Sequence, residues 1–294
     1  MVIDRMRHHQ VVPIRTGTVG QKLSVTSDML DNPVNGILEA TGMMTRCPPA
    51  SLKEYVGCLF ALTAARGARV RTVPDGCTSI VIEFPAGAPP RSMLGGPRLQ
   101  PACYEPPAIT DVIGVRLNPG TAFALIGTPI SNLVERRHSL ADLMGMAGQQ
   151  LDERMAIAQS VEARFDVLES ILVARLSGAR IDPRVKRALR EITESSGEAK
   201  LSGVARGCGI SLRQLERLML KWVGISPKRL ARIARFQALL GAVADGPPPL
   251  WTPLAAEYYA DQSQLIREFS EFAGKSPRRY FTDRAEDSRV ARCP

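Results

Sequence analysis

The sequence of 294 residues has no run of 18 or more apolar residues, so it offers no candidate for a membrane-spanning helix. Its first ten residues, MVIDRMRHHQ, lack the apolar core of a secretion signal. The six cysteines form no C-x-x-C pair, and His8, His9 and His138 are too few and too dispersed for a metal-binding cluster. We therefore expect a cytoplasmic protein with reduced thiols that binds no membrane, metal or cofactor.

Signatures of catalysis are missing as well. There is no Ser/His/Asp set, no phosphate-binding glycine loop and no G-x-S-x-G segment. Asp75 and Glu83 flank a predicted hairpin, but an aspartate between Pro74 and Gly76 is typical of a turn. We predict no catalytic residue and expect that the protein is not an enzyme. A carboxylate enzyme that needs no histidine stays open as an alternative.

Positive charge is concentrated in the C-terminal part of the chain. Residues 1–179 contain 17 Lys and Arg against 16 Asp and Glu, a net charge of +1. Residues 180–294 contain 21 against 13, which gives +8 of the total of +9. Such a surplus favours an anionic partner for this part, and nucleic acid before a membrane.

The same basic part contains one segment twice. Residues 204–230 align with residues 254–280 without a gap, at an offset of 50. Two copies are too few for a solenoid, so they predict a tandem pair of supersecondary units. The identical pairs are Ala205/Ala255, Gln214/Gln264, Leu215/Leu265, Arg217/Arg267, Gly224/Gly274, Ser226/Ser276, Pro227/Pro277 and Arg229/Arg279.

Each copy has the pattern of a helix–turn–helix. Ser211 with Gln214, and Asp261 with Gln264, predict a capping box at the start of a second helix. Apolar residues then recur at helical spacing and predict one buried stripe per copy. These residues are Leu215, Leu218, Met219 and Trp222 in the first copy and Leu265, Phe269 and Phe272 in the second.

A G-x-S-P joint closes each copy. Gly224 and Gly274 suit the left-handed backbone position just past a helix end, and Ser226 and Ser276 suit an N-cap. The first joint opens a helix expected to reach about residue 244, before DGPPP at 245–249. At roughly 27 Å, it could hold two recognition helices about one DNA turn, roughly 34 Å, apart.

Residues 184–283 resemble the DNA-binding domain of the AraC/XylS family of bacterial transcription regulators. The segments "SLRQLERLMLKWVGISPKRLARIARFQALL" and "DQSQLIREFSEFAGKSPRRY" carry the resemblance. It implies two helix–turn–helix units on promoter DNA, with RNA polymerase as a further partner to test. It also implies that Arg213, Glu216, Arg217, Gln262, Ser263, Gln264 and Arg267 read bases. The cations expected at DNA phosphates are Lys221, Lys228, Arg229, Lys275, Arg278 and Arg279.

Simpler roles stay open for some of these residues. Gln214 and Gln264 are placed to cap helices without reading a base. Glu216 is placed to pair with Arg213 or Arg217, and we favour that role over contact with a cytosine. In the second turn, "EYYADQ" has Tyr258 where the family usually has glycine, a departure that could strain or reshape the turn.

We expect an α+β chain whose β-rich part loosely resembles the cupin-like sensor domains of such regulators. Residues 151–176 form an apolar stripe, which we interpret as core rather than a dimer seam. The resemblance implies control by a small molecule or by homodimerisation. The expected divisions are a flexible leader (1–45), the sensor domain with trailing helices (46–179), the DNA-binding domain (180–284) and a tail (285–294). Within the DNA-binding domain they are unit one (201–222), a linker helix (227–244) and unit two (252–272).

Two other functions compete with this one. The N-terminal part could be an enzyme or a self-modifying unit, as in alkylation-response proteins, although the dispersed cysteines supply no zinc-held acceptor. The tandem units could instead bind protein, in which case binding to DNA would depend little on salt.

Overall fold

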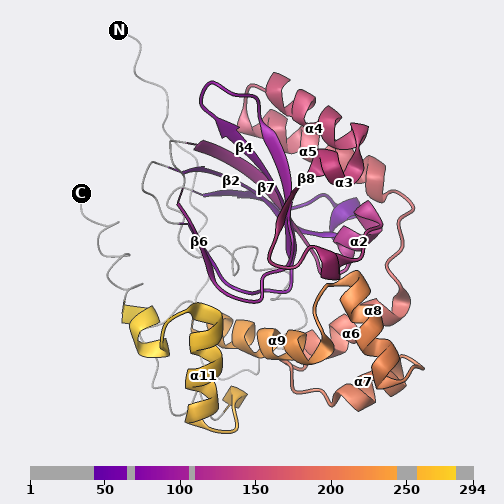
Figure 1. Ribbon diagram of the computed structural model, residues 1–294, viewed down its shortest axis with the longest axis vertical. Coiled ribbons are helices and arrows are strands. Elements are labelled where there is room, and N and C mark those ends of the chain that lie inside the picture. The colour runs from indigo at the N-terminus through magenta and orange to yellow at the C-terminus, as the bar shows by residue number, and fades with distance from the viewer. Residues whose placement is uncertain (1–42, 65–69, 106–109, 244–256, 283–294) are drawn as a thin grey trace.

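The computed structural model describes residues 43–64, 70–105, 110–243 and 257–282 (Figure 1). Within these ranges no helix is both long and apolar enough to cross a bilayer. Most of the expected leader, the DGPPP segment, residues 252–256 of the expected second unit and the expected tail lie outside them.

The N-terminal part is built on an antiparallel sheet with the strand order β1-β2-β7-β4-β5-β8. At its centre, Gly114 makes room for a neighbouring strand, because a Cβ there would lie 2.4 Å from the Phe60 ring. The strands are β1 (Met44–Arg46), β2 (Val56–Ala64), β4 (Thr78–Pro85), β5 (Arg91–Gly95), β7 (Thr110–Leu117) and β8 (Arg137–Ser139). Two further strands, β3 (Val70–Thr72) and β6 (Ala102–Tyr104), pair with each other in a separate ribbon.

Three helices, α3 (Leu140–Met144), α4 (Met146–Ile157) and α5 (Val161–Leu176), cover one face of this sheet (Figure 1). The burial of the predicted apolar stripe confirms that it is part of the core. Leu151, Met155 and Phe165 are buried in one cluster with strand residues. The stripe is divided between two helices, because Ser160 caps α5 by accepting a hydrogen bond from the Ala163 N–H.

The predicted hairpin around Pro74 is wrong. Strand β3 pairs with β6, whereas β4 pairs with β5 and β7. The turn itself is present: Asp75 Oδ1 accepts from the Cys77 N–H at 2.8 Å, and Asp75 Oδ2 accepts from Arg116 Nε at 3.0 Å. Asp75 therefore holds a turn and a buried ion pair, as a turn aspartate should. Glu83 pairs with Arg137 instead.

The C-terminal part is helical, with α6 (Pro183–Glu194), α7 (Leu201–Gly207), α8 (Leu212–Trp222), α9 (Pro227–Ala242) and α11 (Gln262–Ala273). Figure 1 shows α8 and α11 near opposite ends of α9. Helix α9 lies at the centre of this core, with Ile233, Phe236 and Leu239 fully buried. Asp182 and Pro183 open α6 as N-cap and first residue, as predicted.

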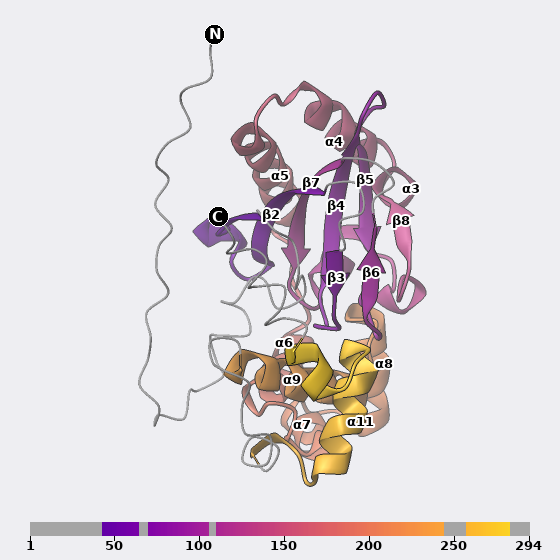
Figure 2. The ribbon, with the colours of Figure 1, turned by 90° about the vertical axis from the view of Figure 1, so that its left-hand side faces the viewer.

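The two parts of the chain are packed against each other, and Figure 2 shows β3 and β6 directed toward the C-terminal helices. Three short elements, α2 (Thr121–Ile126), η1 (Ala50–Leu52) and η2 (Ile130–Asn132), complete the N-terminal part, and α2 and η2 contact α8. The Phe123 ring of α2 lies 4.5 Å from the Trp222 ring of α8. In the middle of α9, Gln237 Nε2 donates to the Pro74 carbonyl at 2.5 Å.

Candidate nucleic-acid interface

Helix α8 begins with the capping box predicted from the sequence. Ser211 Oγ accepts from the Gln214 N–H at 3.2 Å, and Gln214 Oε1 accepts from the Ser211 N–H at 2.8 Å. Leu215 and Met219 are fully buried beneath this first turn. The local sequence thus fixes both where α8 starts and which of its faces is turned away from the core.

The opposite face of α8 presents the predicted base-reading side chains to solvent. Arg213, Glu216 and Arg217 are all exposed. Glu216 was expected to pair with one of these arginines, but the part of the chain described here shows no ion pair for it. Among the described residues, the two guanidinium groups and the carboxylate of this face have no ion pair. They are therefore available to donate to and accept from the edges of base pairs.

Helix α11 repeats the N-cap and the exposed face of α8. Asp261 is its N-cap and accepts from the Gln264 N–H at 2.7 Å. Gln262, Ser263 and Arg267 are exposed, and Gln264 is half-buried at the cap. Arg217 and Arg267 each occupy the sixth position of their helices. The two exposed faces therefore carry an arginine at the same distance from the helix N-terminus.

The turn before α11 differs from its counterpart before α8 in its shape, and backbone strain, the other outcome expected at Tyr258, is absent. Glu135 and Ser196 are the only described non-glycine residues with positive φ, so Tyr258 adopts an ordinary backbone conformation. Tyr258 is half-buried, and its neighbour Tyr259 is buried in the core. The equivalent of Tyr259 in the first unit is Gly209, whose φ is +68°. The second turn is therefore reshaped around an aromatic core residue without backbone strain.

The glycines of both G-x-S-P joints have the predicted backbone geometry. Gly224 and Gly274 follow their helices with φ of +81° and +71°. Ser226 Oγ accepts from the Arg229 N–H at 3.3 Å and so caps α9, and a short helix over 277–282 follows Ser276. The Gly224 N–H also satisfies carbonyls in the last turn of α8, at 3.1 Å from Met219 O.

The six predicted phosphate contacts are in different surroundings. Lys228, Arg278 and Arg279 are exposed at helix N-termini. Lys221 is exposed too, with its Nζ 5.0 Å from the centre of the Phe123 ring. Lys275 is half-buried.

Arg229 differs most from expectation. It pairs with Glu271, and its second terminal nitrogen donates to the Leu99 carbonyl at 2.7 Å. Both terminal nitrogens of this guanidinium are therefore bonded to other residues of the protein.

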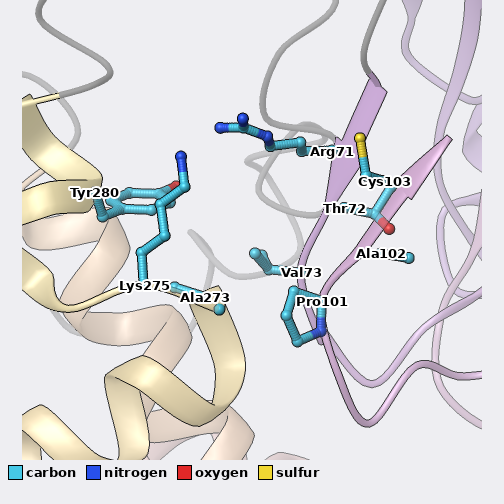
Figure 3. A pocket seen from close by; sticks show the side chains of 10 residues that line it. Arg71, Thr72, Val73, Pro101, Ala102, Cys103, Ala273, Lys275 and Tyr280 are labelled. Atoms are coloured by element: carbon cyan, nitrogen blue, oxygen red, sulfur yellow. The ribbon is translucent and has the colours of Figure 1, made fainter. Parts of the chain in front are cut away.

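A cavity of about 210 Å³ separates the β3–β6 ribbon from the second unit (Figure 3). Arg71 of β3 and Lys275 beyond α11 extend into it from opposite sides. Much of the wall is apolar, with Val73 and Pro101 on the ribbon side and Ala273 on the other. The remaining lining residues are Thr72, Ala102, Cys103, Gly274 and Tyr280.

Sequence reasoning missed one feature of the site, a row of ion pairs between α9 and α11. Arg232 Nε lies 2.9 Å from Glu268 Oε1, and Arg232 also pairs with Glu271. Arg235 lies 3.5 Å from Glu268 Oε2. A signal was available, since basic residues recur every three positions along α9 and acidic ones three positions apart on α11.

Comparisons with known proteins match both parts of the chain. A family model described as a domain of unknown function (DUF6597) matches residues 44–139, from β1 to β8. No curated protein matches the chain.

Apo ToxT with a lysine-to-alanine substitution, from Vibrio cholerae strain SCE256, is a similar solved structure. It has 9% identity and a TM-score of 0.38, covering 84% of this chain and 95% of that one. Another structure of ToxT from Vibrio cholerae has 9% identity and a TM-score of 0.41, covering 82% and 98%.

The resemblance to the AraC/XylS family rests on the chain's own residues. The motifs of residues 204–230 and 254–280 are found here on α8 and α11, with the predicted caps, joints and exposed faces. The helix between them, α9, is the linker that these motifs require. By its motifs and by this arrangement, the C-terminal part of the chain keeps the resemblance to the AraC/XylS family that its sequence shows.

Proposed function

We propose that this protein is a sequence-specific DNA-binding transcription regulator whose helices α8 and α11 enter successive major grooves. The observation that carries the proposal is the pair of exposed faces, each with an arginine at the same helical position and each on a capped helix. Helix α9, with its 16 residues, is about 24 Å long and joins the two. The net charge of +8 in residues 180–294 suits a polyanion.

Selection of bound duplexes from a random pool, with the full chain, tests this proposal. The expected product is a site with two conserved blocks about one helical turn apart. If about six to eight phosphates are contacted, affinity for that site should fall about a thousandfold or more between about 50 and about 200 mM salt. A weak salt dependence would favour the protein-binding alternative.

The N-terminal part is proposed to control DNA binding, through a small molecule or through dimerisation. Support comes from its direct contacts with α8 and α9, at Trp222 and Gln237. The cavity of about 210 Å³ beside the β3–β6 ribbon is lined on its other side by Ala273 of α11 and so joins the N-terminal part to the second unit. A full chain that selects a duplicated site would indicate a dimer. A contact with RNA polymerase stays a prediction.

A further inference from the structure

The first recognition helix is held by apolar contacts. Leu215 and Met219 of α8 are fully buried, and Trp222 packs on Phe123 of the N-terminal part. Helix α11 shares an apolar core with α9 as well, through Phe269 and Phe272. Apolar contacts are not directional, so they allow packed helices to slide or rotate more freely than hydrogen bonds do.

Only the second recognition helix adds charged contacts with α9 in the described part of the chain. We use the term arginine face for Arg229, Arg232 and Arg235, which lie three residues apart on one side of α9. Glu271 pairs with the first two, and Glu268 with the last two. Each carboxylate therefore lies between two guanidinium groups. The positions 50 residues earlier are Leu218 and Lys221, so the first unit has no equivalent.

This pattern gives both carboxylates two guanidinium groups each in one axial register only. If α11 moved one turn toward the C-terminal end of α9, Glu268 would lie between Arg235 and Ala238 and would keep one of its two arginines. A move of one turn in the other direction would place Glu271 between Ser226 and Arg229, again with one arginine. Either move removes one of the two guanidinium groups beside a carboxylate, and Glu268 has a side chain only 9% exposed. Leaving a buried charge without its partner is costly.

Aromatic rings also lie against the same guanidinium groups. Arg229 and Arg232 lie over the Phe272 ring, with 4.8 and 5.2 Å between the guanidinium carbon and the ring centre. Arg235 lies 5.5 Å from the centre of the Tyr259 ring in the turn before α11. A planar guanidinium held between a ring and a carboxylate has little freedom to reorient.

We infer that Glu268 and Glu271, clasped by the arginine face of α9, are positioning residues that set the aim of the second recognition helix. This inference rests on the proposed DNA-binding function. It also changes the role of Arg229, which acts on DNA through the orientation of α11 rather than by holding a phosphate. The first helix does not depend on this contact, so the two halves of a DNA site should respond differently when it is removed.

The test uses the full chain and duplexes selected from a random pool. The half-site read by α11 is first assigned as the one whose base preference is relaxed by Arg267→Ala. Glu268→Gln and Glu271→Gln are then compared with Glu191→Gln. This control removes an ion pair with Arg187 inside α6, at 2.7 Å in the wild type. Glu271→Gln guards against misfolding, because its side chain is 37% exposed.

Glu268→Gln and Glu271→Gln should each lower base discrimination at the α11 half-site about tenfold and keep it at the other half-site, while Glu191→Gln keeps both. Equal losses at the two half-sites, or full discrimination in Glu271→Gln, would overturn the inference while leaving the proposed function intact. A wild-type chain that selects no DNA would overturn both.

Discussion

Replacement of Arg217 by alanine gives the sharpest test of base reading. The side chain is exposed on α8 and has no hydrogen bond or ion pair in the described part of the chain. Its removal should therefore change the free energy of unfolding by no more than about 0.5 kcal/mol. The binding free energy for the preferred duplex should weaken by about 1–3 kcal/mol, which is about 5- to 150-fold in affinity.

The assay is competition binding of the wild type and Arg217→Ala to the selected duplex and to duplexes with one base pair changed at a time. The variant should lose discrimination at one position of one half-site. Arg267→Ala should lose it at one position of the other half-site, which makes each variant the control for the other. A uniform loss across all duplexes would refute the reasoning and would make Arg217 a phosphate contact.

Three further predictions concern the fold that holds this surface. Leu215→Asp places a charge at a fully buried position and should unfold the first unit, seen as loss of helical circular dichroism and of DNA binding. Hydrogen bonds from Arg232 and Arg229 outweigh burial and lower the pKa of Glu271 below its ordinary 4.5. Because that pKa is depressed, its contribution to stability is complete above pH 4.5 and is lost as the pH falls further, a loss that should be smaller in Glu271→Gln. Burial raises the pKa of Cys58 to about 11 and of Cys77 to about 12, so both should resist alkylation until the protein unfolds, as followed by intact mass. Rapid mass gain at either thiol in the folded chain would favour the self-modifying alternative.

The features predicted correctly from sequence are those fixed by neighbours along the chain. Ser211 and Asp261 cap helices because of residues three positions ahead. Gly224 and Gly274 take positive φ because the chain must leave a helix there. The core stripes follow from helical periodicity alone. Each of these predictions was stronger because the same pattern occurs in both copies of the repeat.

The errors came from contacts between distant segments. Strand β3 pairs with β6, about 30 residues away, and nothing in its own sequence distinguishes that partner from β4. Arg229 was expected at a phosphate because it follows a helix start. In the folded chain it donates to the Leu99 carbonyl and pairs with Glu271. The ion pairs of Arg232 and Arg235 also join segments more than 30 residues apart, and the sequence analysis made no prediction for these two residues.

The most direct measurement is the affinity for a duplex in which the two half-sites have been moved apart. Five base pairs inserted between them in the selected duplex rotate one by about half a turn relative to the other. Because α8 and α11 are joined by a packed helix of about 24 Å, they cannot follow that rotation. Binding should fall to the affinity of a single half-site and return when the insert is removed. Unchanged affinity for the extended duplex would contradict the account.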